Sequence, residues 1–304
     1  MEPVRGGVYS VCCCVPIYVL QFIVYVAIFC AFLLSGVAAP YTRFALVGVW
    51  DVFWVLAVWS HCSVSLTPVK TVPSRFRPPV YVLRALSLCV DALEQDRQLL
   101  SYARSVGLPV ERRRDLAALR FSPVDHISYC TICCCLQPAR AFHCNACNAC
   151  ILKMDKHSVV AGTCVNFANQ KSFILWLLYL FLLQIFYTAT LLHYMPNLWS
   201  IQHRRHTPTF IALLFTSICL VLALVVLLVT GVYLVGQLSK VFRNQTATEI
   251  GHQYDLGTWQ NWTQVFGNRP LLWFLPVHTA PGNGYTFPVL ADQLDNPIST
   301  AVDI

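Results

Sequence analysis

The chain has 304 residues, of which 57% are hydrophobic and only 12% are charged, and this composition excludes an ordinary soluble globular domain. Its formal net charge of +7 does not indicate nucleic-acid binding, because 14 of the 21 Lys and Arg residues lie between Lys70 and Lys171, with hydrophobic segments on both sides. Basic residues in such a position set membrane orientation or contact anionic lipid headgroups. We therefore expect a protein that contacts membrane lipids and does not bind nucleic acid.

Four apolar stretches are long enough to cross a bilayer as helices, because one span needs about 20 residues. In chain order they are Val15–Val37, Phe44–Leu66, Phe173–Met195 and Phe210–Gly236. We interpret the first as a retained span and not as a cleaved signal peptide, because it is long and aromatic and follows little basic charge. The many basic residues between the second and third spans predict that this segment, and with it both termini, is cytosolic.

The segment between the second and third spans begins with a linker. Its prolines predict an extended chain over residues 67–82. Apolar residues at helical intervals then predict a single amphipathic helix from Leu83 to Val106. We expect this helix to cover the following module or to lie on the membrane surface.

Between Cys130 and Cys164 the residues that can bind metal follow the formula C-x2-C-x9-H-x6-C twice, offset by 14 residues. The first copy consists of Cys130, Cys133, His143 and Cys150, and the second of Cys144, Cys147, His157 and Cys164. Three thiolates and one imidazole form a closed tetrahedral site, so we predict two structural Zn²⁺ ions that do not activate water. Cysteines that are merely buried or lipidated are the alternative. Cys134 and Cys135 lie outside the formula and have no assigned role.

These features together predict an all-α membrane protein with four transmembrane helices and a cytosolic two-zinc cysteine-rich module between spans 2 and 3. The predicted divisions are the N-terminus with the first two spans, the linker with its amphipathic helix, the zinc module, the last two spans and a cytosolic tail: residues 1–66, 67–129, 130–173, 174–236 and 237–304. Asn244 and Asn261 head glycosylation sequons, and in a cytosolic tail both should stay unmodified.

The sequence around the predicted ligands resembles the DHHC-type protein S-acyltransferases, or palmitoyltransferases. Besides the ligands, the positions that match the family pattern include Pro138, Arg140, Asp155, Asn169 and Phe173. After the fourth span, Thr246 to Glu249 resembles the family's Thr-Thr-x-Glu motif with its second threonine replaced by Ala247, and Asn261 matches the asparagine of a C-terminal motif. With four spans in the same order, the resemblance runs from Val15 to Gly267.

The resemblance implies an enzyme in which the cysteine of Asp-His-His-Cys takes an acyl group from acyl-CoA and passes it to a protein cysteine at the cytosolic face. The first histidine of that motif acts as the base, and the aspartate orients it. It also implies acyl-CoA as a substrate or ligand, cytosol-facing protein clients, and a location in the endoplasmic reticulum or Golgi. In this chain the motif reads Asp155-Lys156-His157-Ser158. Ser158 therefore occupies the nucleophile position, Lys156 the base position, and Asp155 the position of the orienting carboxylate.

A serine hydroxyl is much less acidic than a thiol and needs a competent base. Lys156 follows an aspartate that favours its charged form, and His157 is already assigned to the second zinc site. We therefore predict a catalytically inactive or strongly impaired family member that binds acyl chains, clients or an active homologue. One alternative is an active acyltransferase that uses Ser158, Cys134 or Cys135. The other is a zinc-stabilised membrane scaffold.

Overall fold

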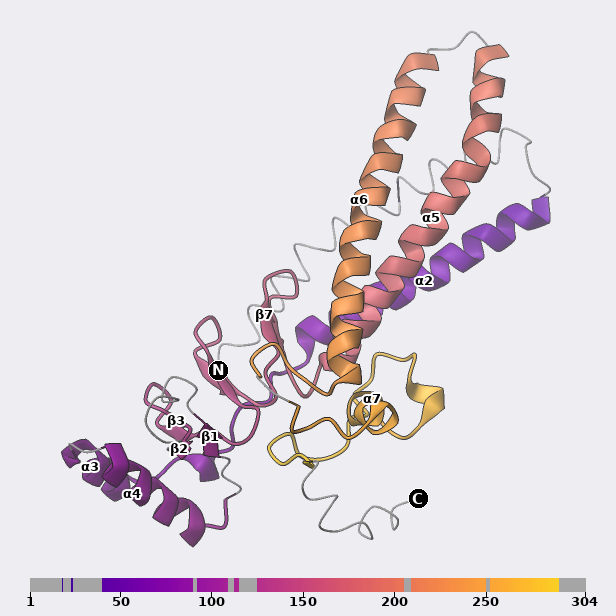
Figure 1. Ribbon diagram of the computed structural model, residues 1–304. Coiled ribbons are helices and arrows are strands. Elements are labelled where there is room, and N and C mark those ends of the chain that lie inside the picture. The colour runs from indigo at the N-terminus through magenta and orange to yellow at the C-terminus, as the bar shows by residue number, and fades with distance from the viewer. Residues whose placement is uncertain are drawn as a thin grey trace.

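The computed structural model describes residues 40–89, 92–108, 112–114, 125–204, 209–249 and 252–289, together with Tyr18 and Ile23. Three long helices form one part of the molecule, and a set of small two-stranded sheets with further short helices lies beyond one end of them (Figure 1). Apart from Tyr18 and Ile23, the predicted first span lies outside the described residues.

The three long helices are α2 (Pro40–Leu66), α5 (Gln170–Arg204) and α6 (Thr209–Phe242). Each contains a run that is long and apolar enough to cross a membrane: Phe44–Leu66, Gln170–His193 and Ser217–Phe242. Helix α5 packs against both α2 and α6 (Figure 1). The first of these runs has the predicted bounds of the second span. The last extends beyond the predicted end at Gly236, because α6 continues through the polar residues Gln237 and Lys240.

The cysteine-rich module is not helical, so the all-α prediction is wrong for this part of the chain. It consists of three antiparallel hairpins, β3 (Tyr129–Cys130) with β4 (Cys135–Leu136), β5 (Phe142–Cys144) with β6 (Ala149–Ile151), and β7 (Lys156–Ser158) with β8 (Thr163–Val165). A further pair, β1 (Arg112–Arg114) and β2 (Asp125–Ile127), precedes them. Strands of two or three residues are too short to produce an alternating sequence pattern.

The linker after α2 is extended and packs along the module. The backbone N–H of Val72 donates to the carbonyl of Cys150 at 3.0 Å, and the N–H of Leu152 donates to the carbonyl of Lys70 at 2.8 Å. Phe76, in the short 3-10 helix Ser74–Phe76, is fully buried. The linker is therefore joined to one edge of the module by backbone hydrogen bonds.

The prediction of one amphipathic helix from Leu83 to Val106 is wrong, because the segment forms two helices, α3 (Val80–Leu88) and α4 (Ala92–Ser105). The chain becomes extended at Cys89, whose carbonyl accepts a hydrogen bond from Gln95 Nε2 at 2.9 Å. Leu99 and Ala103 of α4 are buried in the core of the first hairpins. Both helices lie at the end of the module that is farther from α5 and α6 (Figure 1).

Helix α7 (Thr258–Phe266) follows α6 and packs beneath its end (Figure 1). The rings of Trp262 and Phe266 stack at 3.9 Å, and Trp262 also stacks on Phe242 of α6. The chain then returns across the module, where the Phe287 ring packs edge-on against Phe167. The segment after the last span thus closes against the cysteine-rich module.

Candidate functional site

The first Cys/His cluster joins two neighbouring hairpins. The β3–β4 hairpin supplies Cys130 from β3 and Cys133 from its turn, and the β5–β6 pair supplies His143 and Cys150, which lie directly opposite each other. The Nδ1 atom of His143 lies 3.5, 3.2 and 3.9 Å from the sulfurs of Cys130, Cys133 and Cys150. A tight knuckle and a cross-strand pair therefore converge on one point.

The second cluster repeats this arrangement one hairpin further along the chain. Cys144 and Cys147 come from the β5–β6 hairpin, and the directly opposed His157 and Cys164 come from β7–β8. The Nδ1 atom of His157 lies 3.7, 3.4 and 3.5 Å from the three sulfurs in chain order. The 14-residue offset in the sequence is thus the repeat length of the hairpins.

Both clusters fit a metal ion. In each, one imidazole nitrogen and three sulfurs lie within 4.8 Å of one another, as expected for tetrahedral zinc with bonds of about 2.3 Å to sulfur and about 2.0 Å to nitrogen. Burial, followed by the hydrogen bond with Cys150, raises the pKa of Cys133 to about 12. Crowded thiols of this kind ionise readily only beside a cation. A zinc ion at each cluster would hold adjacent hairpins together.

Asp155, which precedes β7, is buried and connects the module to α6. Its Oδ1 atom accepts hydrogen bonds from Lys240 Nζ at 2.9 Å and from the backbone N–H of Ala247 at 2.8 Å, and its Oδ2 accepts one from Gln237 Nε2 at 3.2 Å. Neither of these α6 partners is among the residues predicted from the sequence. Polar residues at the end of an apolar run were their only signal. The Asp155 carboxylate therefore accepts hydrogen bonds from three groups that lie in or after α6.

Lys156 and Ser158 lie on the same face of β7, because side chains alternate along a strand. The Nζ atom of Lys156 lies 5.1 Å from the ring centre of Phe173 and 5.0 Å from that of Tyr233. Burial lowers the pKa of Lys156. The negative charge of Asp155 raises this pKa, but its effect is smaller than that of burial. The sequence alone predicts the opposite direction for this pKa, because the adjacent Asp155 is visible in it and burial is not. The hydroxyl oxygen of Ser158 accepts a hydrogen bond from the backbone N–H of Ala161 at 3.2 Å.

His61 of α2 lies against the turn that follows Ser158, and it is not among the predicted site residues. Its ring makes a hydrogen bond with the backbone of Val160 and packs 4.7 Å from the Trp176 ring. The side chain is 1% exposed, and its Nε2 atom has no partner among the described residues. An ionisable residue within an apolar span is itself a signal of function. This imidazole was therefore detectable from the sequence.

The segment after α6 docks onto the module through charged and polar side chains. Glu249 accepts two hydrogen bonds from Arg140, at 2.6 Å from Nε and 2.9 Å from an Nη atom. The other Nη of Arg140 donates to Asn244 Oδ1 at 3.0 Å. The backbone N–H of Thr246 donates to Glu249 at 3.0 Å, and the hydroxyl of Thr248 donates to the Met154 carbonyl at 3.0 Å. Arg140 and Glu249 thus form a buried bidentate pair across the interface.

Asn261, in α7, is fully buried and satisfies the backbone at the end of α6. Its Nδ2 donates to the Phe242 carbonyl at 2.7 Å and to Asp255 Oδ1 at 2.6 Å, while its Oδ1 accepts the N–H of Leu256 at 2.9 Å. The carbonyls of a helix terminus need such partners. Asn261 therefore positions the tail against the end of α6.

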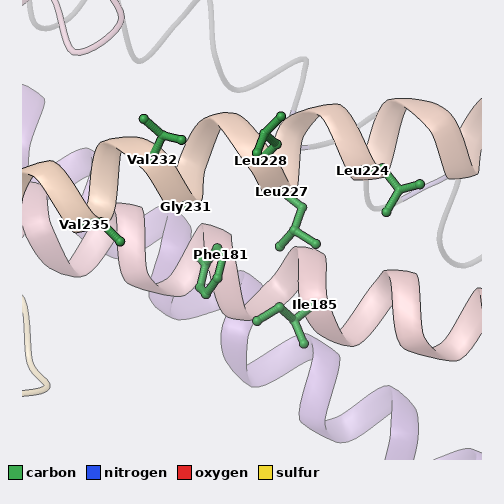
Figure 2. Close-up of a pocket in the computed structure, with 8 residues that line it drawn as sticks. All are labelled: Phe181, Ile185, Leu224, Leu227, Leu228, Gly231, Val232 and Val235. Carbon is green, nitrogen blue, oxygen red and sulfur yellow. The ribbon is translucent and has the colours of Figure 1, made fainter.

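A groove of about 700 Å³ lies between α5 and α6 (Figure 2). Its lining consists of Phe181, Ile185, Leu224, Leu227, Leu228, Gly231, Val232 and Val235. A β-carbon on Gly231 would lie 3.0 Å from a ring carbon of Phe181, so the glycine keeps this part of the groove open. The wall is apolar throughout, and the groove lies within the candidate spans.

Comparison with known proteins agrees with this architecture. Residues 124–254 match the family model described as DHHC palmitoyltransferase. The chain is 29% identical to human palmitoyltransferase ZDHHC20 over 296 residues, which cover 92% of this chain and 78% of the relative. It is 27% identical to palmitoyltransferase ZDHHC15 of Xenopus laevis over 300 residues, covering 94% of this chain and 85% of the relative. Over most of its length this chain is therefore similar to DHHC palmitoyltransferases, and its long apolar helices are those of a multi-pass membrane protein.

Proposed function

We propose that this family member binds acyl chains and cytosol-facing protein clients, alone or with an active homologue, but transfers acyl groups poorly or not at all. The arrangement on β7 is the observation that carries the proposal. Lys156 and Ser158 keep the spacing of a base and a nucleophile on one strand face, but the nucleophile is a hydroxyl. The Asp155 carboxylate is engaged by Lys240, Gln237 and a backbone N–H, so it is not reserved for orienting a base.

The metal clusters have a structural role in this proposal. The eight residues proposed as zinc ligands are Cys130, Cys133, His143 and Cys150 for the first ion, and Cys144, Cys147, His157 and Cys164 for the second. Four ligands complete each tetrahedron, so neither ion would activate water or a substrate. When bound, the ions would fix the positions of the hairpins, including β7.

The groove between α5 and α6 supports binding of an acyl chain. Its apolar lining matches a hydrocarbon chain, and its volume of about 700 Å³ lies in the usual range for small-molecule sites. Acyl-CoA is therefore the proposed ligand, with its chain in this groove. We further propose an endoplasmic reticulum or Golgi location with both termini in the cytosol.

An acyl-CoA that carries a photoreactive group and a clickable tag tests this proposal. Purified protein with two zinc ions per chain should crosslink to the probe under light and acquire no label in the dark. Gly231→Leu should reduce crosslinking, because its side chain would meet Phe181. Gly236→Leu is the matched control, since no atom lies within 4 Å of the β-carbon position there. Label acquired in the dark would refute loss of transfer, and equal crosslinking of both variants would refute binding in the groove.

A second candidate, active transfer through Ser158, is favoured by one observation. The buried imidazole of His61 hydrogen-bonds to Val160 in the turn that follows Ser158, and its Nε2 has no partner among the described residues. If His61 acts as the base, the dark label would be an oxyester, which hydroxylamine at neutral pH does not remove. It would disappear in both Ser158→Ala and His61→Phe. A hydroxylamine-labile label would instead indicate a thioester on a cysteine such as Cys134.

A further inference from the structure

One side chain outside the eight predicted ligands donates a hydrogen bond to one of them. Gln137 follows β4 in the first hairpin, and its Nε2 atom lies 3.4 Å from the sulfur of Cys150, on β6 of the next hairpin. Two further hydrogen bonds fix Gln137. Its backbone N–H donates to the Ser128 carbonyl at 2.7 Å, and the Ser128 hydroxyl donates to its Oε1 atom at 2.6 Å. The amide N–H groups are therefore held toward the Cys150 sulfur from outside the cluster.

A metal-bound thiolate fits the NH2 end of this amide. Such a thiolate accepts hydrogen bonds but has no proton to donate, so it pairs with the donor end of a carboxamide and not with the carbonyl end. Three thiolates around one zinc ion leave the site negatively charged, and a donor at one sulfur stabilises that charge. Because the hydrogen bond draws electron density from the sulfur, it also makes the thiolate a weaker nucleophile.

We propose that Gln137 is a positioning residue of the first predicted zinc site. Its amide holds the Cys150 thiolate at the metal and protects the sulfur from electrophiles, so that zinc leaves this site more slowly. The hydrogen bond joins two hairpins without passing through the ion. The inference rests on the zinc ions of the proposed function and is independent of acyl-CoA and of Ser158.

The second cluster provides an internal comparison, because the repeat gives each position of the first a counterpart 14 residues later. The hydrogen-bonded pair Ser128 and Gln137 has an apolar counterpart. It consists of Phe142 and Ile151, which lie directly opposite each other in the β5–β6 register. Ile151 is fully buried and aliphatic, so its side chain offers no donor to the second cluster. Removing the Gln137 amide is therefore expected to affect one zinc ion and not the other.

Zinc release from the full-length protein in detergent tests this inference. Protein with two zinc ions per chain is mixed with an excess of a coloured chelator and with N-ethylmaleimide, which labels each cysteine as it becomes free. Mass spectrometry then shows which cluster has lost its ion. Gln137→Leu should release zinc from the first cluster about 10–100-fold faster, which is the usual effect of removing a hydrogen-bond partner of a ligand. Release from the second cluster should stay unchanged.

Three further variants separate hydrogen bonding from packing. Gln137→Glu keeps the shape of the side chain but presents no donor when ionised, so it should release zinc at least as fast as Gln137→Leu. Gln137→Lys retains a donor and should slow release again. Gln98→Leu is the matched control, because Gln98 Nε2 donates to the sulfur of Cys89 at 3.3 Å, away from both clusters. Its zinc release should equal that of the wild type.

Cobalt substitution gives a spectroscopic readout that packing alone would not change. Removing a hydrogen bond raises the energy of the sulfur electrons, so the sulfur-to-cobalt absorption of Gln137→Leu should move to longer wavelength. In Gln137→Lys the band should return toward its wild-type position. An unshifted band in Gln137→Leu would contradict donation to the metal-bound sulfur.

Equal release rates for Gln137→Leu and the wild type would overturn the inference. The same acceleration at both clusters would also overturn it, because it would indicate general loosening of the module. If Gln137→Leu does not purify, Ser128→Ala decides, since it frees the Gln137 amide and should speed release from the first cluster alone. Unchanged release from Ser128→Ala would then refute the role of Gln137. A wild-type chain without zinc at the first cluster would instead refute the zinc assignment itself.

Discussion

One module carries both the hairpins with the predicted zinc ligands and the strand face with Lys156 and Ser158. These two regions differ in how far they keep the residue pattern of the DHHC palmitoyltransferases. All eight ligand positions are filled, and they gather in space as two compact clusters. On β7, Lys156 and Ser158 stand at the positions that the resemblance assigns to the base and the nucleophile, and His157 between them is part of the second cluster. Under the proposed function, the fold of the module and any reaction on β7 therefore depend on different residues, even where these alternate along one strand.

The contacts of Asp155 show how the substituted motif remains part of the fold. Its carboxylate binds Lys240 and Gln237 of α6 and the backbone of Ala247. Three hydrogen bonds to a buried carboxylate hold it in one position and stabilise the contact between the two elements that they join. Asp155 can thus be retained for packing the module against the bundle, whether or not it orients a base.

The largest expected effect is the loss of one predicted zinc ligand. Cys164→Ala removes a fully buried sulfur of the second cluster and should leave one zinc ion per chain. The expected destabilisation is about 4 kcal/mol or more, as for other lost metal sites. Metal analysis and the unfolding midpoint in detergent measure both effects. Ser158→Ala, on the same hairpin, should change neither the zinc content nor the midpoint. Equal loss of zinc and stability in the two variants would contradict separate roles for the predicted ligands and Ser158.

The next largest effect is expected at the interface between the module and the segment after α6. Glu249→Gln leaves the buried Arg140 guanidinium without its carboxylate, and breaking such a pair typically costs about 3–5 kcal/mol. The unfolding midpoint in detergent should fall accordingly. Glu94→Gln breaks the exposed pair with Arg97 and should have no measurable effect. Similar midpoints for the two variants would contradict the role assigned to Glu249.

A smaller loss is expected at α7. Asn261→Ala leaves the Phe242 carbonyl and the Leu256 N–H without their side-chain partner, and each buried unpaired group costs about 1–3 kcal/mol. Unfolding should become easier by about this amount while two zinc ions remain bound. The exposed Gln260→Ala in the same helix serves as the control. Loss of zinc from Asn261→Ala would show that the tail and the module are not separable.

The smallest expected effect is a dependence on pH. Hydrogen bonds from Asn261 and then from the Gly257 N–H hold the pKa of Asp255 below its ordinary value of 3.8. A carboxyl with a depressed folded-state pKa stabilises the protein above its unfolded-state pKa, and this contribution disappears as the pH falls through the folded-state value. Unfolding midpoints measured from pH 6 downward should therefore decline less steeply for Asp255→Asn than for the wild type. Parallel curves would exclude this carboxylate as a source of acid sensitivity.

The sequence predicted what depends on local spacing. The C-x2-C-x9-H-x6-C repeat predicted which residues would share each cluster, and the apolar run Phe44–Leu66 predicted a span with the bounds that the structure has. It did not predict the Asp155–Lys240 pair, because the two residues are 85 positions apart and no local pattern connects them. It also missed the break at Cys89, where the side chain of Gln95 satisfies a carbonyl in place of the helix backbone.

The structure also changes the meaning of the two sequons. Asn244 and Asn261 are 3% and 0% exposed, and both side-chain amides donate hydrogen bonds to backbone carbonyls. Neither amide is accessible in the folded protein, so a lack of glycans is uninformative about orientation. A sequon appended after residue 304 is the better probe of the proposed cytosolic C-terminus. This sequon should remain unmodified, and a glycan there would show that the C-terminus is not cytosolic.

The most direct test of the account is to restore the substituted chemistry within the retained frame. Ser158→Cys and the double variant with Lys156→His would be incubated with tagged acyl-CoA, with two zinc ions per chain verified in each. A positioned general base typically contributes a factor of about 10²–10⁴, so the double variant should acquire hydroxylamine-labile label far faster than the single variant, and the wild type should acquire none. Equal labelling of the single and double variants, or no labelling of the double variant with both metals bound, would contradict the central claim. That claim is that the fold is intact and that only the nucleophile and the base are missing.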